Sequence, residues 1–157
     1  MPKPLQLHQK ERSEASHSDE YETPDETFEW ICKHFNIYPE LDVCAQYGTN
    51  KAAKFYSPEE DGLSHPWKVW NVWCNPPHSK TKEFALKADA EWVQNNINIM
   101  MLVPANAVCA KYFSNIFNKG HAKYYRYEGR IRFLVDGVPS KHPSRNAYFV
   151  VVWRKLR

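Results

Sequence analysis

The apolar residues near the start of the chain repeat with the spacing of an α-helix. Ile31 and Phe35 are four residues apart, which places their side chains on one face of a helix. Thr23 and Pro24 come before this run, and they suit an N-cap and a first helical position. The pattern therefore predicts a helix over residues 24–36 with Thr23 as its N-cap.

The remaining apolar stretches alternate between strand-like and helix-like patterns. The run INIMMLV at residues 97–103 is apolar throughout, which is typical of a strand buried on both faces of a sheet. Residues 46–66 show no regular pattern, and one helical turn is expected there near residues 51–55. Further strands are expected at 41–45, 69–74, 122–127, 130–135 and 147–154, and further helices at 81–94 and 107–117.

The order of these elements predicts an α/β fold. Strands that alternate with helices favour a parallel sheet with right-handed crossovers, and the consecutive strands at the end favour an antiparallel C-terminal hairpin. The expected architecture is a reduced Rossmann-like sheet, mostly parallel. Residues 1–18 are polar and charged without an apolar period, so we expect a disordered or loosely attached tail before a single domain over residues 19–157.

Composition narrows the classes of function. The 157 residues are 43% hydrophobic, enough for one domain with its own core. The net charge is only +3, but residues 119–157 are rich in Lys and Arg and can face phosphates. The four cysteines form no CxxC pair, which argues against a zinc ribbon. No signal peptide is visible and no apolar run approaches the roughly 18 residues of a membrane span, so a cytoplasmic location without membrane contact is expected.

The run Asn75-Pro76-Pro77-His78 ends the expected strand VWNVWC and is the strongest candidate for chemistry. The side-chain carbonyl of Asn75 and the backbone carbonyl of Pro76 can both accept hydrogen bonds, and the two prolines stiffen the turn. Such a pair can hold an exocyclic amino group and localise its lone pair, while the ring of His78 stacks on the base. The alternative for His78 is a surface histidine in a turn.

These residues resemble the catalytic tetrapeptide (D/N)PP(Y/F/W) of the phage-type DNA N6-adenine methyltransferases, the small Dam-like enzymes of bacteriophages and prophages. The resemblance extends over about residues 19–154. In chain order, its segments are TP at 23–24, LDVCA at 41–45, EDGL at 60–63, VWCNPP at 72–77, LVPA at 102–105, GRIRF at 129–133 and PSRNAYFVVVWR at 143–154. It implies a class I methyltransferase sheet and methyl transfer to the exocyclic N6 of adenine in DNA, with Asn75, Pro76, Pro77 and His78 catalytic. It also implies a protein of a phage or prophage that protects phage DNA inside a bacterial cell, as in restriction-modification.

The same resemblance implies S-adenosylmethionine as the cofactor and DNA as the partner. Asp61 either accepts hydrogen bonds from the cofactor or forms an Asp-Gly turn, and Asp42 has a turn or helix cap as its alternative. The implied cofactor-binding residues are Tyr21, Thr23, Pro24, Asp42, Val43, Cys44, Ala45, Asp61 and Asn75. The expected DNA-binding residues are Ser79, Lys80, Lys82, Arg130, Arg132, Lys141 and Arg145, each with a solvated surface side chain as its alternative. The loop 136–146 is the expected place for sequence reading in a groove.

Two departures from the family pattern keep other functions open. His78 replaces the usual aromatic residue, and only Gly48 stands where a glycine-rich cofactor loop is usual. Both departures favour a non-catalytic nucleic-acid-binding module on a degenerate methyltransferase fold, and His78 also suits an enzyme for cytosine N4. No metal is expected, because the seven histidines show no ligand spacing. The oligomeric state is not indicated.

Overall fold

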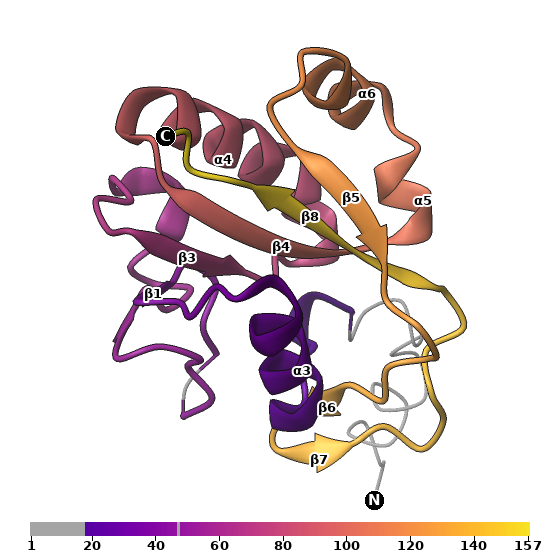
Figure 1. The fold of residues 1–157 in the computed structure, drawn as a ribbon. Coiled ribbons are helices and arrows are strands. Elements are labelled where there is room, and N and C mark those ends of the chain that lie inside the picture. The colour runs from indigo at the N-terminus through magenta and orange to yellow at the C-terminus, as the bar shows by residue number, and fades with distance from the viewer. Residues whose placement is uncertain (1–17, 47) are drawn as a thin grey trace, which may run out of the picture.

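The computed structural model describes residues 18–46 and 48–157 as a six-stranded sheet with helices on both faces (Figure 1). The strand order is β2-β1-β3-β4-β8-β5. The strands are β1 (Leu41–Asp42), β2 (Lys54–Phe55), β3 (Asn71–Cys74), β4 (Asn98–Pro104), β5 (Lys123–Arg126) and β8 (Tyr148–Trp153). A separate hairpin is formed by β6 (Leu134–Val135) and β7 (Val138–Pro139). The helices are α3 (Asp25–Phe35), α4 (Thr81–Asn95), α5 (Ala105–Val108) and α6 (Lys111–Asn118), with 3-10 helices at Ser18–Glu20, Gly62–Ser64 and His78–Lys80.

The sheet confirms the predicted fold class. Strands β1, β2, β3 and β4 run parallel, whereas β8 lies antiparallel between β4 and β5. The longest pairing joins β4 to β8, with Met101 opposite Val151. This pairing explains the continuous apolar run of β4, which has a strand on each side and helices over each face.

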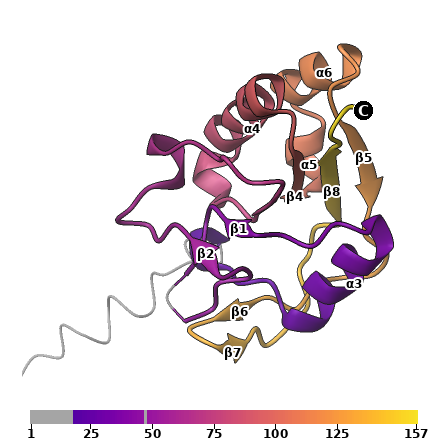
Figure 2. The same cartoon turned by 60° about the vertical axis from the view of Figure 1, so that its left-hand side comes forward.

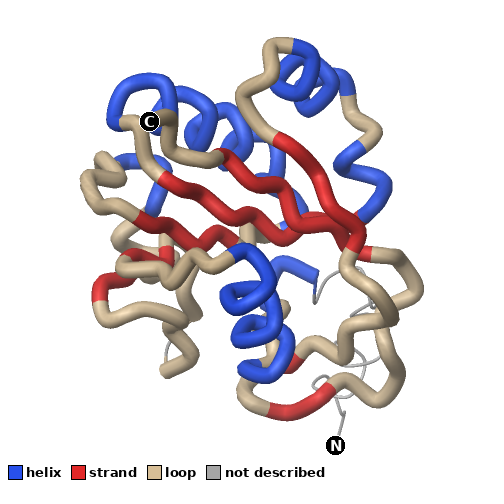
Figure 3. The backbone as a smooth tube through the Cα atoms, in the orientation of Figure 1, coloured by secondary structure: helices blue, strands red, loops and turns tan. Residues whose placement is uncertain are grey.

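Side chains of the central strands alternate between two cores. Val72 and Ile99 pack with α4 and α6 on one face, while Trp73 and Met100 pack with α3 on the other. The second core also contains Ile131, from the segment that leads into β6. Figure 3 shows α3 on one side of the strands and α4 to α6 on the other. The β6–β7 hairpin lies beside α3, away from the sheet (Figure 2). This arrangement leaves the carboxyl ends of β1 and β3 facing the hairpin side of the molecule.

Several predicted elements differ from the structure in extent. The expected strand at 41–45 is reduced to Leu41–Asp42, and the expected turn of helix at 51–55 is wrong because Lys54–Phe55 pairs with β1. The expected helix at 107–117 is broken at Ala110, whose backbone is extended with φ −71° and ψ 151°.

The expected strand at 130–135 is limited to Leu134–Val135 because the chain turns back at Asp136 and Gly137. These two residues have φ of 53° and 75°. Positive φ at both positions is the geometry of a tight two-residue hairpin turn, for which Asp-Gly is a favoured pair.

The start of α3 also differs from the prediction. Pro24, rather than Thr23, occupies the N-cap position, and its helix end has no side-chain cap. The hydroxyl of Thr23 instead accepts a hydrogen bond from Asn75. Thr23 as the N-cap is therefore wrong, because its side chain is committed to a contact across the fold.

The predicted tail lies almost wholly outside the described residues. The described residues begin at Ser18, in the 3-10 helix Ser18–Glu20, so the boundary between a tail and a single domain stays a prediction. Across residues 18–46 and 48–157, no helix is long and apolar enough to cross a membrane. The same residues contain no group of three His, Cys, Asp or Glu side chains placed to hold a metal ion.

Candidate active site

Two cavities meet near the carboxyl ends of the parallel strands, where open α/β sheets usually bind ligands. The first is a narrow crevice of about 10 Å³, which we call the polar crevice. It is lined by Tyr21, Glu22, Thr23, Asp42, Cys44, Gln46, Thr49, Lys51, Trp73 and Asn75. The second is a wider cavity of about 610 Å³, which we call the aromatic pocket. It is lined by Tyr21, His78, Ile131, Phe133, Val135, Tyr148 and the segment 140–146.

Asn75 has a fixed side-chain orientation in the polar crevice. Its amide nitrogen donates to the backbone carbonyl of Tyr21 at 3.1 Å and to the hydroxyl of Thr23 at 3.0 Å. A backbone carbonyl can only accept, so the amide nitrogen must face Tyr21 and the amide oxygen must face the other way. Both N–H groups are thereby used, and the Oδ1 atom of Asn75 is left as the acceptor.

Asp42 lies at the end of β1 and is almost completely buried, with 2% of its surface exposed. Its two carboxylate oxygens accept backbone N–H bonds from Cys44 at 3.1 Å and Lys51 at 2.9 Å. Burial raises the pKa of Asp42 from 3.8 to about 6, against the opposing effect of these two bonds. Asp42 therefore fixes the loop that follows β1 and places a carboxyl group in the crevice.

The other residues predicted from the LDVCA segment have different positions. Cys44 lines the crevice, and its sulfur lies 3.8 Å from that of Cys74. Val43 and Ala45 are buried, and their backbone N–H groups donate to Trp73 and Tyr56. Val43 and Ala45 thus hold the strand end in place through the backbone.

Asp61 is not among the residues that line the polar crevice. Its carboxylate accepts hydrogen bonds from the Leu63 backbone at 3.1 Å and the Ser64 hydroxyl at 2.7 Å, which caps the 3-10 helix Gly62–Ser64. These bonds hold the pKa of Asp61 below its usual range. A Cβ atom at Gly62 would lie 2.1 Å from the carbonyl oxygen of Val43, so only glycine allows this turn to approach the strand end.

Glu22 is a crevice residue that the sequence prediction missed. Its side chain is buried, with 7% of the residue exposed, and its Oε2 atom has no hydrogen-bond partner among the described residues. Burial raises the pKa of Glu22, while the backbone N–H groups of Gly137 and Asp136 act in the opposite direction. The crevice therefore contains two buried carboxyl groups, Glu22 and Asp42, which together favour a cationic ligand. The sequence signal was the position of Glu22 directly before Thr23 and Pro24.

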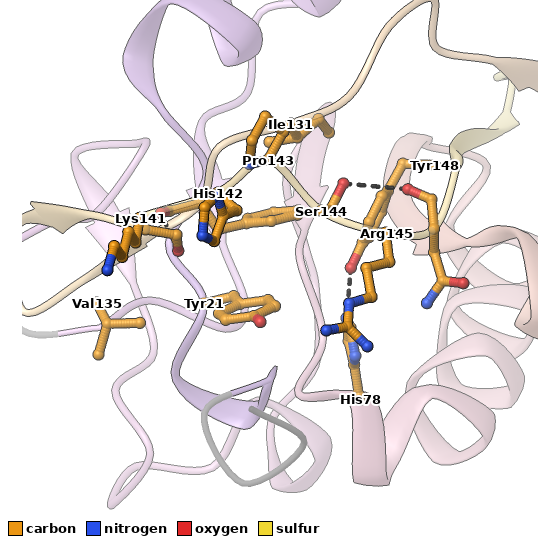
Figure 4. Close-up of a pocket in the computed structure, with 13 residues that line it drawn as sticks. Tyr21, His78, Ile131, Val135, Lys141, His142, Pro143, Ser144, Arg145 and Tyr148 are labelled. Atoms are coloured by element: carbon orange, nitrogen blue, oxygen red, sulfur yellow. Dashed lines mark hydrogen bonds between the residues drawn. The ribbon is translucent and has the colours of Figure 1, made fainter. Parts of the chain in front are cut away.

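His78 lies at the end of the same turn but faces the aromatic pocket. A hydrogen bond of 3.1 Å joins its Nε2 atom to the hydroxyl of Tyr148, and its ring meets Tyr21 edge to face at 5.7 Å between centroids (Figure 4). Phe133 stacks on Tyr21 at 4.9 Å. Burial lowers the pKa of His78 and raises that of Tyr148, so the imidazole is neutral and the phenol protonated at neutral pH. The partly exposed rings of Tyr21 and His78 form a surface on which a flat ligand can stack, and the buried rings of Phe133 and Tyr148 support them from behind.

The open side of the aromatic pocket is basic. Lys141 and Arg145 are exposed and both line the pocket, along whose edge the segment 140–146 runs in Figure 4. Hydrogen bonds from Ser140 to the Phe133 carbonyl and from the Ser144 backbone to Ile131 hold that segment in position.

The remaining predicted DNA-binding residues lie elsewhere. Ser79 and Lys82 line an adjoining groove of about 520 Å³ that also contacts His78, and Ser79 donates to Asp19 at 2.6 Å. Lys80, Arg130 and Arg132 are exposed and are not among the residues that line the crevice, the pocket or the groove.

The two cavities are connected by the Asn-Pro-Pro-His turn and by Tyr21. Asn75 lines the crevice, His78 lines the pocket, and Tyr21 lines both. Pro76 is buried between them, and the carbonyl of Pro77 accepts a hydrogen bond from Lys80 that starts the next helical turn. A ligand in the crevice and a second ligand in the pocket would therefore be neighbours on either side of Tyr21 and this turn.

Comparison with known proteins gives consistent matches. The family model described as DNA N-6-adenine-methyltransferase (Dam) matches residues 10–157. The DNA N-6-adenine-methyltransferase of Haemophilus phage HP1 is 30% identical over 125 residues, which cover 80% of this chain and 72% of that protein. The protein of the same name from Escherichia phage T1 is 36% identical over 89 residues, covering 56% of this chain and 37% of its own length. The solved structure of a proposed RNA methyltransferase from Pyrococcus horikoshii shares the fold, with a TM-score of 0.52 at 14% identity over 93% of this chain and 86% of that one.

Proposed function

The chain belongs to the DNA N-6-adenine-methyltransferase (Dam) family and is an adenine-N6 DNA methyltransferase, and we propose that the polar crevice holds its cofactor and the aromatic pocket its target base. The observation that carries this assignment is the Asn-Pro-Pro-His turn, whose first residue lines one cavity and whose last residue lines the other. The polar crevice suits a cation and the aromatic pocket suits a flat ring. The two cavities thereby match the two substrates of the reaction.

The chemistry of the polar crevice fits S-adenosylmethionine, which carries a sulfonium and an ammonium group. Asp42 and Glu22 are buried acids, and Glu22 has an oxygen without a partner among the described residues. The N-terminus of α3, which follows Thr23 and Pro24, offers the backbone N–H groups of Asp25 and Glu26 to a carboxylate. The crevice is narrow, with about 10 Å³ of space, so its walls must separate when the cofactor binds. When bound, S-adenosylmethionine supplies an electrophilic methyl group.

Asn75 orients the amino group of the target adenine. Its Oδ1 atom accepts one N–H bond of the exocyclic amine, and the carbonyl of Pro76 accepts the other. These bonds concentrate the nitrogen lone pair, which is otherwise delocalised into the ring, and direct it toward the crevice. The side chain of Asn75 is held by Tyr21 and Thr23, so this positioning needs little reorganisation. Asn75 is not a base, and the proton that the amine loses leaves to water.

The aromatic pocket accepts the adenine after it leaves the DNA stack. Bases inside a duplex are out of reach of an enzyme site, so the target nucleotide must be extruded. The partly exposed rings of Tyr21 and His78 offer stacking surfaces, and the hydrogen bond with Tyr148 fixes the imidazole. His78 can therefore fulfil the stacking role of the usual Tyr, Phe or Trp, with a smaller ring held more firmly.

The basic rim positions the DNA backbone around the extruded base. Lys141 and Arg145 are exposed at the mouth of the pocket, where they can contact phosphates or base edges. Ser79 and Lys82, in the adjoining groove, suit the backbone next to the extruded nucleotide. Because the relatives are phage proteins, we place the activity in the cytoplasm of a bacterial host, where methylation protects phage DNA.

Incubation with methyl-labelled S-adenosylmethionine and unmethylated plasmid, followed by mass spectrometry of the nucleosides, tests the assignment. The expected product is N6-methyladenine, and it should be lost in Asn75→Ala while cofactor binding persists. N4-methylcytosine would overturn the choice of base. The absence of any product from a protein that binds DNA would favour a non-catalytic module.

A further inference from the structure

One side-chain oxygen of Glu22 is buried and unpaired within the part of the chain that the structure describes. The Oε2 atom is buried and has no hydrogen-bond partner among residues 18–46 and 48–157. Leaving a buried carboxylate oxygen unpaired is costly, so such atoms in folded proteins usually have a reason to persist. Glu22 lines the polar crevice together with Thr23 and Asn75, so a ligand in that crevice can reach it.

Backbone hydrogen bonds also hold Glu22 in its position. Its backbone forms an isolated bridge with Leu134, through hydrogen bonds of 2.8 Å and 3.0 Å. The β6–β7 hairpin thereby holds Glu22 at the crevice wall. Of the charged groups that act on Glu22, Asp136 has the same sign, and the ammonium of Lys51 is paired with Asp25 at 2.7 Å. A carboxylate in this setting favours a ligand that is both cationic and a hydrogen-bond donor.

We propose that Glu22 binds the α-ammonium of the methionine part of S-adenosylmethionine, an assignment that rests on the proposed cofactor site. The sulfonium is cationic but has no N–H or O–H to donate, whereas ribose hydroxyls and the adenine amine donate without a charge. Only the α-ammonium has both properties. The α-carboxylate of the same methionine is complemented by the N-terminus of α3 nearby, so the zwitterion meets opposite charges at its two ends.

Calorimetry with three ligands tests the assignment on the full chain. The ligands are S-adenosylmethionine, S-adenosylhomocysteine, which lacks the sulfonium, and deaminated S-adenosylhomocysteine, which lacks both cations. The wild type should bind S-adenosylhomocysteine about 10- to 100-fold more tightly than its deaminated form, the usual range for a hydrogen bond between charged groups. Glu22→Gln should weaken the binding of S-adenosylhomocysteine by a similar factor and should change the affinity for the deaminated ligand by no more than about twofold. Glu29→Gln, at an exposed position of α3, is the matched control and should change neither.

A second variant removes the carboxylate altogether. Glu22→Met keeps a side chain of similar length but no charge or acceptor, so the preference for the aminated ligand should be lost, while a cooperative thermal unfolding transition without ligand checks that the chain is still folded.

Three results would overturn the assignment. Equal weakening of both S-adenosylhomocysteine forms in Glu22→Gln would indicate a structural role only. Weakening of S-adenosylmethionine alone would place the carboxylate at the sulfonium. Failure of the wild type to bind any of the three ligands would remove the proposed cofactor site itself.

Discussion

The polar crevice and the aromatic pocket lie on either side of Tyr21 and are built in different ways. The crevice is narrow, and its functional groups are fixed by backbone hydrogen bonds, as for Asp42 with Cys44 and Lys51. The pocket is wide and open, and its walls are rings in mutual contact with a rim of exposed basic side chains. The first arrangement suits the charged groups of a cofactor once the crevice has widened, and the second suits a base that arrives from a duplex.

This difference predicts which step of the reaction a substitution affects in each cavity. Changes in the crevice should act on cofactor affinity or on the chemical step, because they disturb groups with fixed positions. Changes in the pocket should act on capture of the base and on DNA affinity. Asn75 links the two sides in the proposed mechanism, since its nitrogen is bound in the crevice wall and its oxygen is left to accept from the amine of the target base.

The largest effect is expected at Asn75. Asn75→Ala should reduce the rate of methyl transfer by roughly 100- to 1000-fold, the usual loss when one fixed hydrogen-bonding group at a reacting centre is removed. Cofactor affinity should change much less. Single-turnover methylation and calorimetry measure the two quantities, with Asn115→Ala on the exposed face of α6 as the control.

Asn75→Asp separates the two roles of the amide. The family pattern allows Asp at this position, but here the amide nitrogen faces the Tyr21 carbonyl at 3.1 Å, where a carboxylate oxygen would be repelled. We therefore expect a loss of stability of about 1–3 kcal/mol in urea unfolding, in addition to the loss of activity. Wild-type stability in Asn75→Asp would contradict this orientation of the amide.

The next effect concerns pH and Asp42. Because burial raises the pKa of Asp42 from 3.8 to about 6, the folded protein keeps a proton that the unfolded chain has already released. This contribution to stability is complete below pH 3.8 and is lost as the pH rises through about 6. The size is on the order of 3 kcal/mol.

Urea unfolding of the protein without cofactor, between pH 4 and 8, measures this contribution. Asp42→Asn should lack it, so the difference in free energy of unfolding between the two proteins should change with pH and level off above about pH 7. The side-chain nitrogen of an asparagine at position 42 would face one of the two backbone N–H groups, of Cys44 or Lys51, and could not accept its hydrogen bond. The comparison therefore uses the pH dependence of stability and not its absolute value. Parallel curves for the two proteins would contradict the raised pKa.

Elements that depend on local sequence patterns could be predicted from the sequence, whereas contacts between distant parts of the chain could not. The helix α3 and the strand β4 were predicted because their patterns are local, and the Asn-Pro-Pro-His turn was recognised because prolines follow an apolar run. The two-residue strand β1 was predicted too long and β2 was missed, since strands of this length leave almost no periodicity.

Local sequence patterns could not predict which residues contact the site residues. Tyr148 lies 70 residues from His78, and Glu22 is placed by a backbone bridge to Leu134. Nothing in the composition around Tyr148 distinguishes it from an ordinary core residue, and Glu22 was marked only by its position directly before Thr23 and Pro24. Both contacts depend on how the β6–β7 hairpin and β8 return to the first helix, which only the complete fold determines.

A smaller effect is expected from His78. His78→Ala removes one stacking surface, so kcat/KM for DNA should fall about 5- to 100-fold, in line with the loss of about 1–3 kcal/mol per stacked base. Cofactor affinity should be unchanged, because His78 is not a crevice residue. His78→Phe should keep most of the activity, since it restores a ring without the hydrogen bond to Tyr148. If His78→Phe were as slow as His78→Ala, the hydrogen bond and not the stacking would be the important contact.

The smallest effect is expected at the rim. Lys141→Ala should weaken DNA binding by only a few-fold at physiological salt and lower the slope of log affinity against log salt by about 1, as for the loss of one phosphate contact. The loss should be the same for every DNA sequence. Arg145→Ala provides the contrast, because a guanidinium can also bind a guanine edge at two points.

A loss at Arg145 that varies with the bases around the target adenine would show that the segment 140–146 reads sequence, whereas a uniform loss would limit it to the backbone. Lys33→Ala, on the exposed side of α3, is the control and should leave binding unchanged. If Lys33→Ala weakened DNA binding as much as Lys141→Ala, the attraction would come from the overall charge. The rim residues Lys141 and Arg145 would then give no support to the distinction between a fixed crevice and a DNA-facing pocket.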